Sequence, residues 1–491
     1  METGEHTPQL QRAEVTLLGA VMTGAAIMAP SASILFGVAV IAGVAGSAVP
    51  LIFIIAALGV IATGNSLARF AGVWPSAGSF VTFITKVFGP TIGLWIGVTA
   101  LLGYLISCAA VFLFIGDFLG NDFLGGNTSA GVTSLAMIAF VGVVLFLVVR
   151  GVAVSVRVSL IALAIEVTVI LLIVAAVLLD GGPHGVSLHP FALPPGGFQP
   201  IALGFAITVF LFGGFEQPVP LAEETRNPRR NVPLAVVICV LGIGALYVLA
   251  SWALVIAFGD GGVLAKQADP LHAAAHQYAG WLAPLIKWVL LSSFLGFGVA
   301  AVTAVSRILF NTAREGLLPA ALGRVHVSHR TPAASAAAYA GLALVIALAA
   351  KAITDTTTAV TLLSTAGSLL IIVMYVLVNA ALVVWFVRES REGHRHNGLT
   401  CVVIPLFGIA VLASPFYYDL KPGQLSPLDL VPWVLAGAVV ATVAYVAWIR
   451  VARQAQLANA GRILAGESEM PTGHAPSPLA EVATVGRAAE A

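Results

Sequence analysis

Charged side chains are scarce in this sequence of 491 residues, which has 23 Lys and Arg, 22 Asp and Glu, and a formal net charge of +1. They make up 9% of the chain, whereas the hydrophobic residues make up 59%. A typical soluble protein is about 25% charged. So few polar side chains cannot cover a globule in water, and we therefore expect the chain to be solvated by lipid. The near-zero net charge gives no basis for nucleic-acid binding.

Cysteines and recognisable catalytic motifs are also lacking. The three cysteines, Cys108, Cys239 and Cys401, each lie in an apolar run without a CxxC pattern, which predicts small buried hydrophobic residues. The pairs His272/His276 and His394/His396 show no accompanying set of cysteines or carboxylates, so we interpret them as loop histidines rather than metal ligands. No HExxH, phosphate-binding glycine loop or Ser-His-Asp pattern is found. We therefore expect no metal, no cofactor and no enzymatic activity.

What the sequence does contain is long apolar runs. A helix that crosses a bilayer needs about 20 apolar residues, and the segments do not alternate apolar with polar residues as barrel strands do. The predicted fold is an all-α polytopic membrane protein with twelve transmembrane helices. The twelve segments lie near 16–41, 46–68, 88–118, 131–149, 153–179, 199–223, 233–258, 284–312, 333–352, 357–387, 399–418 and 429–450.

The segments between and beyond these helices differ in composition. Residues 1–12 form a short polar arm that does not resemble a cleaved signal peptide. Residues 453–491 are rich in Ala, Gly, Pro and Glu, and we expect them to be disordered. Residues 180–198 and 259–283 are long loops in which Pro and Gly favour irregular structure. The membrane domain is therefore predicted to occupy residues 13–450.

The distribution of basic residues predicts the orientation in the membrane. Nineteen of the 23 Lys and Arg residues fall on one predicted side. The other side holds only Lys266, Lys287, Lys351 and Lys421. Because basic residues concentrate in cytoplasmic loops, we expect both termini in the cytoplasm and the protein in the cell membrane.

Two of the predicted helices contain residues that should interrupt them. Pro30 follows Gly24-Ala25-Ala26 in the first segment, and the sixth contains Gly213-Gly214-Phe215-Glu216-Gln217-Pro218. Proline removes a helix hydrogen bond, and unwound backbone at membrane depth must line a cavity or be buried in protein. Ordinary kinks are the alternative, above all for the first segment. Two interrupted helices, each opening a group of five, predict inverted repeats at about 12–180 and 199–388 with two extra helices in 399–450.

Three stretches of sequence closely resemble one family of transporters. The first is Phe212–Glu216 with residues 221–233 (LAEETRNPRRNVP), the second lies within 306–326 (SRI, AREGLLP and LGRVH), and the third within 74–90 (WPSAGSF and FGP). The chain resembles the amino acid–polyamine–organocation superfamily of permeases over about residues 12–450. The resemblance implies the five-plus-five inverted-repeat fold and secondary transport of amino acids or related amines.

The resemblance also implies a substrate site at the two interrupted helices. In the family, exposed backbone amides of the first break hold the substrate carboxylate, which here would involve Gly24, Ala25, Ala26 and Ile27. The family often shows Gly-Ser-Gly at this position, and the extra methyl groups of this chain would narrow the site. The second break contributes residues 212–215 (Phe212, Gly213, Gly214 and Phe215). In the family an aromatic at the position of Phe215 covers the substrate and can contact an ammonium group, with simple packing as the alternative.

Two carboxyl groups fall within apolar helices and are candidates for ion coupling. A charged residue at membrane depth is a functional hypothesis by default. Glu216 could carry a proton, or could tie the sixth helix to the first by hydrogen bonds. Glu166 could be a proton carrier, a cation ligand, a partner for a cationic substrate, or a local hydrogen-bonding group. Ser292 and Ser293 could supply hydroxyls to a sodium ion, although hydroxyls in apolar helices more often bond to their own carbonyls.

A cluster of charges follows the sixth helix. Glu223 and Glu224 lie beside several arginines, and we expect them to form a cytoplasmic gate with Arg69 or Arg157. A solvated cluster of little energetic value is the alternative.

These observations predict a secondary transporter of amino acids that works by alternating access, most simply by proton-coupled uptake. An exchanger and a polyamine importer are the alternatives, and a channel or a membrane sensor is a more remote one. The expected partners are a small amino acid or amine, a proton or sodium ion, and the lipid bilayer, with the protein as monomer or homodimer.

Overall fold

The computed structural model describes residues 14–126, 129–194, 196–326, 328–421, 424, 426–457 and 460. The described secondary structure is helical, apart from an isolated bridge between Val15 and Thr225. The prediction of an all-α protein is therefore confirmed. The predicted arm at 1–12 lies outside the described residues, as does most of the predicted tail at 453–491. Its described part includes one short helix, α17 (Gln454–Leu457).

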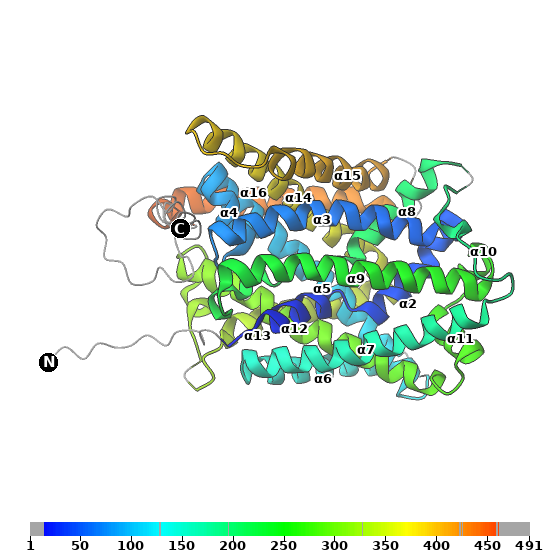
Figure 1. Cartoon of the computed structure of the whole chain (residues 1–491). Coiled ribbons are helices and arrows are strands. Elements are labelled where there is room, and N and C mark those ends of the chain that lie inside the picture. The colour runs from blue at the N-terminus through cyan, green and yellow to red at the C-terminus, as the bar shows by residue number, and fades with distance from the viewer. Residues whose placement is uncertain are drawn as a thin grey trace.

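Long helices lying side by side make up the body of the molecule (Figure 1). Most pack with at least one other long helix: α3 packs on α9, α5 on α14 and α7 on α12. In chain order they are α3 (Val49–Val73), α5 (Pro90–Asp122), α6 (Ala130–Val149), α7 (Val152–Asp180), α9 (Pro228–Phe258), α12 (Ile286–Arg314), α13 (Ala333–Ile353), α14 (Thr356–Arg391) and α16 (Val431–Ala452).

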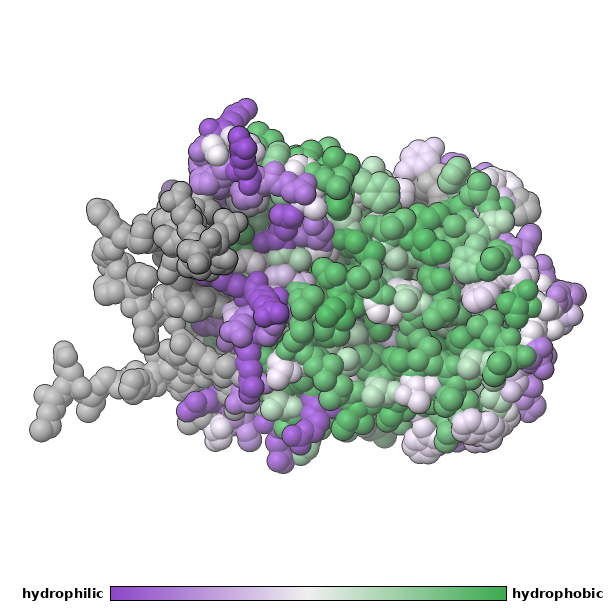
Figure 2. Space-filling model, viewed as in Figure 1, coloured by the Kyte–Doolittle hydropathy of each residue, from purple (hydrophilic) through white to green (hydrophobic). Residues whose placement is uncertain are grey.

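A hydrophobic band covers the middle of the visible face of the molecule, with hydrophilic residues toward both ends (Figure 2). Within the described ranges, nine stretches are long and apolar enough to cross a membrane. These nine stretches do not correspond one to one to the twelve predicted segments. Leu17–Val73 counts as one stretch but contains two of them, α8 (Phe198–Leu211) is short because it is interrupted, and Leu399–Ser414 is a shorter apolar helix. The count of twelve therefore stays a prediction, and the length and composition of the described helices are those of a membrane protein.

The first apolar segment is interrupted where the sequence predicted. Helix α1 (Leu17–Ile27) ends before Met28, and α2 (Pro30–Ala45) begins with Pro30 as its first residue. Proline is favoured at the first position of a helix because its missing N–H would have no partner there. Ala29, between the two helices, has the left-handed backbone angle φ of 43°, which is uncommon for a residue with a side chain.

The sixth segment is also interrupted. Helix α8 ends at Leu211, the chain turns through 212–218, and a tight helix, η3 (Val219–Glu224), continues to the loop. Gly214 has a φ of 112°, a conformation that side chains rarely allow. Gly213 and Gly214, together with Pro218, account for this break.

The two breaks contact each other in the core. A Cβ atom at Gly24 would lie 2.8 Å from Cys239 Sγ and 3.0 Å from Cδ of Pro218. A Cβ atom at Gly214 would lie 2.3 Å from Cγ2 of Ile27. Only glycine permits these approaches. As predicted, the cysteines are buried and free, Cys239 among them.

Shorter helices complete the described part of the fold. The loop at 259–283 was expected to be irregular, but it contains α10 (Gly261–Leu264) and α11 (Pro270–Tyr278), whose first turns are capped by Asp260 and Asp269. Side-chain caps of this kind start helices in polar segments. The others are η1 (Gly46–Ala48), α4 (Ser79–Phe88), η2 (His189–Phe191), η4 (Ala283–Leu285), η5 (Ala320–Gly323), η6 (Leu399–Val403), α15 (Ile404–Asp419) and η7 (Leu428–Leu430).

Candidate functional site

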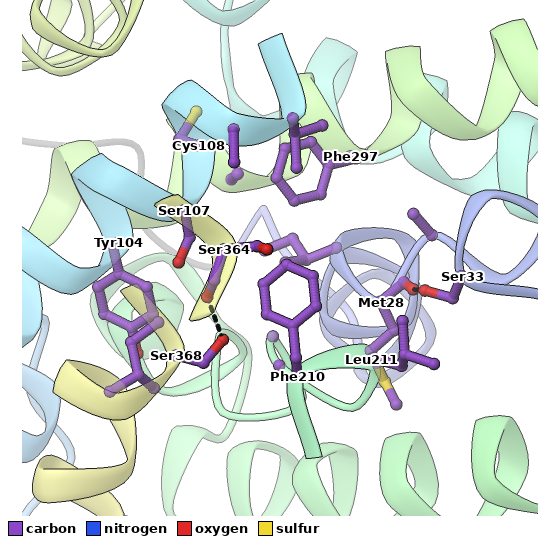
Figure 3. Close-up of a pocket in the computed structure, with 18 of the residues that line it drawn as sticks. Met28, Ser33, Tyr104, Ser107, Cys108, Phe210, Leu211, Phe297, Ser364 and Ser368 are labelled. Carbon is purple, nitrogen blue, oxygen red and sulfur yellow. Dashed lines mark hydrogen bonds between the residues drawn. The ribbon is translucent and has the colours of Figure 1, made fainter. Parts of the chain in front are cut away.

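A cavity of about 140 Å³ lies beside the two breaks. Its wall comes from the hinge between α1 and α2, from α5, from the end of α8 and the turn after it, and from α12, α13 and α14. Figure 3 shows the hydroxyl groups of Ser107, Ser364 and Ser368 on one side of this space and Met28 on the other. A cavity of this size is comparable to one that holds a benzene molecule, so it suits a small organic ligand.

Apolar and uncharged polar side chains form the wall. Among the described residues that line the cavity, none is an Asp, Glu, Lys, Arg or His. The hydroxyls of Ser33 and Ser368 donate to the carbonyls of Met28 and Ser364 at 2.7 and 2.5 Å. A hydroxyl bound in this way keeps its oxygen as an acceptor but must rotate away from the carbonyl to donate to a ligand.

Of the four predicted substrate residues of the first break, one lines the cavity and three do not. Ile27 lines the cavity, whereas Gly24, Ala25 and Ala26 are buried in the last turns of α1 and are not part of the wall. Inside a helix, an amide already donates to the carbonyl one turn earlier, and the groups left open at a helix C-terminus are carbonyls. The end of α1 therefore presents acceptors, which suit an ammonium group better than a carboxylate.

The second break contributes its glycines to the wall but not its predicted aromatics. Gly213 and Gly214 line the cavity. Phe212 is buried against Tyr247, and Phe215 against Tyr375 with ring centroids 5.3 Å apart. In the sixth segment, the phenylalanine that lines the cavity is Phe210, at the end of α8.

Glu216 is fully enclosed by hydrogen-bond donors. Its Oε1 accepts from Tyr104 Oη at 2.6 Å and from Gln217 Nε2 at 3.2 Å. Its Oε2 accepts from Tyr375 Oη at 3.0 Å and from the Gly214 amide at 3.1 Å. An ionised carboxylate can accept all four bonds, whereas a protonated one must donate, so one partner would have to turn. Glu216 thus joins the second break to α5 and α14.

All four of these partners line the cavity. Tyr104, Tyr375 and Gln217 were not predicted as site residues from the sequence. Gln217 is a polar residue within an apolar segment, the same signal that singled out Glu216. The tyrosines are recognisable only as uncommon residues, since the chain has 8 Tyr. Gln217 Oε1 and Ser107 Oγ are buried and have no hydrogen-bond partner within the described part of the chain.

Glu166 lies at the beginning of α2 rather than at the cavity. Its Oε2 accepts from the Ser31 amide at 3.1 Å and from Ser293 Oγ at 2.7 Å, and the Ala32 amide donates to the same Ser293 oxygen at 3.4 Å. A carboxylate at a helix N-terminus is stabilised by the open amides there. Glu166 Oε1 is buried without a partner among the described residues. Ser292, by contrast, donates to the carbonyl of Val289 in its own helix.

The predicted glutamates at one end of the bundle form ion pairs with arginines of α12. Glu224 Oε2 lies 2.8 Å from Arg307 Nε, and both side chains are fully buried. Glu223 Oε1 lies 3.0 Å from Arg314 Nη2 in a more accessible pair. Val15, just before α1, exchanges backbone hydrogen bonds with Glu224 and Arg226. These contacts hold together the start of α1, η3 and α12.

The structure does not bring the predicted arginines to this cluster. Arg69 hydrogen-bonds Thr400 Oγ1, because α3 runs beside the segment that begins α15. Arg157 lies on an exposed part of α7, and no ion pair to it is found among the described residues. The pairing with Arg307 and Arg314 corrects that part of the prediction. Both arginines stand in the second of the stretches that carry the family resemblance.

The histidines after α14 need a further correction. His394 Nδ1 lies 3.2 Å from Glu389 Oε2, and Glu392 stands close to both, although the sequence interpretation found no carboxylates for this pair. Arg388, Arg391 and Arg395 are neighbours in the chain, so the local positive charge disfavours a bound cation.

The architecture defines a class of protein. Two interrupted helices that meet beside a cavity in an apolar helical bundle are typical of membrane transporters. The model of the family described as amino acid permease matches residues 19–453. The chain therefore belongs to the amino acid permease family, and the expectation that it is not an enzyme is confirmed.

Two of the similar proteins match this chain over most of their length, and a third matches over half of its length. The chain is 27% identical over 444 residues to the low-affinity putrescine importer PlaP of Escherichia coli (strain K12), covering 88% of this chain and 94% of that protein. It is 25% identical over 417 residues to the branched-chain amino acid permease BcaP of Bacillus subtilis (strain 168), covering 81% and 85%. It is also 27% identical over 321 residues to the human cationic amino acid transporter 4, covering 62% and 50%.

Proposed function

We propose that this protein is a secondary active transporter that carries amino acids across the cell membrane by alternating access. The observation that carries the proposal is the meeting of two interrupted helices beside a cavity, with a buried ion pair, Glu224–Arg307, tying the segment after the second break to α12. In this proposal the chain spans the membrane twelve times, with inverted repeats at about 12–180 and 199–388 and both termini in the cytoplasm. The helix breaks that open the two proposed halves support this arrangement.

The inner gate of the transporter is proposed to be the cluster of Glu223, Glu224, Arg307 and Arg314. Separating a buried ion pair costs free energy, because each charge is left without its partner. The pair therefore favours the closed state of the gate over a partly opened one. Because the cluster ties η3 to α12, its separation would release the segment that follows the second break. Opening toward the cytoplasm would therefore begin there.

Proton coupling is proposed to involve Glu216, with Glu166 as a second ionisable group. Glu216 is bonded to Tyr104 and Tyr375 on two other helices. A proton on this carboxyl would replace an accepted bond by a donated one, so at least one of the tyrosines must reorient. Protonation is in this way coupled to the packing of the second break against α5 and α14. Glu166 would couple an ion to the beginning of α2 by the same logic.

Two other modes of transport within the family are the alternatives. A polyamine importer is suggested by the putrescine importer among the relatives, and an amino acid exchanger would need no coupling ion. A channel is disfavoured because the described cavity wall shows no ring of charged side chains, which ion channels use to select their ions.

The test is transport by the purified full-length protein in proteoliposomes. Amino acids and polyamines are supplied one at a time, with and without an inward proton gradient, and uptake and current are recorded. Uptake of an amino acid that grows with the gradient supports proton symport. Counterflow without any effect of the gradient supports exchange. The proposal is wrong if folded protein carries out neither.

A further inference from the structure

The chemistry of the cavity wall restricts the substrate beyond the general class of amino acids and amines. We propose that the cavity takes an electroneutral amino acid with a compact apolar side chain, and that Gln217 receives its ammonium group. This inference rests on the proposed transport function. It concerns which substrate the same cavity accepts and which side chain recognises it.

The absence of charge from the described wall excludes strongly ionic substrates. A diamine would bring two positive charges into a space whose described lining holds no carboxylate. Burying a charge without a partner costs several kcal/mol. A zwitterion carries its own counter-charge and needs only neutral donors and acceptors. The nearby carboxylate of Glu216 is already engaged by Tyr104, Tyr375 and Gln217.

The apolar part of the wall suits a hydrocarbon side chain. Phe114 contacts Phe36 and Phe294 with ring centroids 6.2 and 5.7 Å apart, in edge-on arrangements. All three rings line the cavity, as does Phe297. A branched aliphatic or similarly small apolar group would fill such a space by dispersion and hydrophobic contact.

Gln217 offers the acceptor that an ammonium group requires. Its Nε2 donates to Glu216 Oε1, which fixes the amide so that Oε1 faces away from the carboxylate. This oxygen is buried in a wall residue and has no partner among the described residues. A buried acceptor left unpaired costs about as much as a lost hydrogen bond, so a substrate that fills it binds more tightly.

The hydroxyls of the cavity wall suit the other end of the same substrate. Ser107 Oγ is buried without a partner in the described chain, and Ser368 bonds only to a carbonyl of its own helix. Figure 3 shows both on one side of the cavity, together with Ser364. Hydroxyl donors can hold a carboxylate without a positive side chain.

The first experiment compares binding of leucine, lysine, glutamate and putrescine to the full-length protein, together with their transport in proteoliposomes. Leucine is expected to bind at least about tenfold more tightly than the other three, in line with an unpaired buried charge. Equal or tighter binding of lysine or putrescine overturns the substrate class while leaving transport intact. If no compound is transported, the proposed function fails, and that result is distinct from a change in preference.

The second experiment tests the role of Gln217. Gln217→Met keeps the length of the side chain but removes the acceptor, and Gln277→Met on exposed α11 is the matched control. Gln217→Met is expected to weaken the binding of leucine by about tenfold, as for the loss of a hydrogen bond to a charged group. It should change the binding of 2-hydroxy-4-methylpentanoate much less, because this compound has no ammonium group. Equal loss for both compounds overturns the assignment of Gln217.

A third variant keeps the proposal testable if Gln217→Met fails to fold. Ser107→Asp places one carboxylate in the wall, and Ser107→Asn is the uncharged control of similar size. Ser107→Asp should shift the preference from leucine toward lysine relative to Ser107→Asn. If both variants keep the wild-type preference, the charge of the wall does not select the substrate and the proposal is wrong.

Discussion

The hydroxyl of Tyr247 lies 2.7 Å from the carbonyl oxygen of Met28 and 3.0 Å from that of Leu211. The two carbonyls belong to the two broken helices, one just after the end of α1 and the other at the end of α8. A carbonyl at a helix end has no partner inside its own helix. A single buried side chain on α9 therefore links a carbonyl of each break. The Met28 carbonyl also accepts from Ser33 Oγ.

Tyr247→Phe should loosen this link. The change removes the side-chain donor of the Leu211 carbonyl and leaves the Met28 carbonyl with Ser33 Oγ, at a cost of about 1–3 kcal/mol in the free energy of unfolding. Unfolding in detergent and the rate of substrate counterflow are the measurements. Tyr278→Phe is the control, because Tyr278 also donates to a carbonyl, that of Ala257, but away from the breaks. Equal effects of the two changes would show that the link has no special role.

Gly214→Ala should abolish transport. The residue has a φ of 112°, and an added Cβ would lie 2.3 Å from Ile27 Cγ2, so the second break would be forced away from the first. Gly242→Ala is the matched control, since no atom lies within 4 Å of its added Cβ and alanine favours a helix. Uptake in proteoliposomes and thermal unfolding are measured together. Normal uptake by a stable Gly214→Ala protein would contradict the tight approach of the two breaks.

Glu224→Gln and Arg307→Met should each destabilise the protein by about 3–5 kcal/mol, because each leaves a buried charge unpaired. The double variant should regain part of this loss. Glu223→Gln should cost only about 0–1 kcal/mol, since the pair with Arg314 is more accessible. Unfolding of all four variants in detergent gives the coupling energy. Additive losses in the double variant would mean that the pair contributes no coupling.

Features that depend on residues close together in the chain can be predicted from this sequence, whereas features that depend on packing cannot. The helical class and both breaks were predictable, because apolar length, Pro30 and the Gly213-Gly214 pair act locally. The partners of the charged residues were not. Arg307 and Arg69 are both arginines on the predicted cytoplasmic side, so the sequence does not distinguish them. Only the packing of α12 against η3 places Arg307 beside Glu224.

The candidate cavity shows the same limit. The sixth segment was predicted to supply Phe212 and Phe215 to the substrate site, but the turn after Leu211 directs both into the core. Phe210, still on the helix, reaches the cavity instead. The direction of a side chain in an irregular turn depends on backbone angles that residue types do not determine.

Glu166 should act through Ser293 and not through Ser292. Ser293→Ala removes the hydroxyl that donates to Glu166 Oε2 at 2.7 Å, whereas Ser292 bonds to its own helix. We expect Ser293→Ala to shift the pH profile or sodium dependence of uptake as Glu166→Gln does, and Ser292→Ala to leave both unchanged. Uptake is measured across pH with and without sodium. Identical profiles for the two serine variants would contradict a functional contact between Glu166 and α12.

Glu216→Gln should separate proton coupling from substrate exchange. The amide keeps one oxygen that can accept from Tyr104 or Tyr375, but its nitrogen cannot accept the two bonds that the replaced oxygen accepted. The amide also cannot take up a proton as the carboxylate does. We therefore expect uphill uptake driven by a proton gradient to disappear, while counterflow persists with little dependence on pH. Tyr104→Phe should give an intermediate result, because it removes the 2.6 Å donor but leaves the carboxyl able to titrate. Thermal unfolding confirms that each variant is folded. If Glu216→Gln keeps the full pH profile of the wild type, the proton is carried elsewhere, and Glu166 becomes the group to test next.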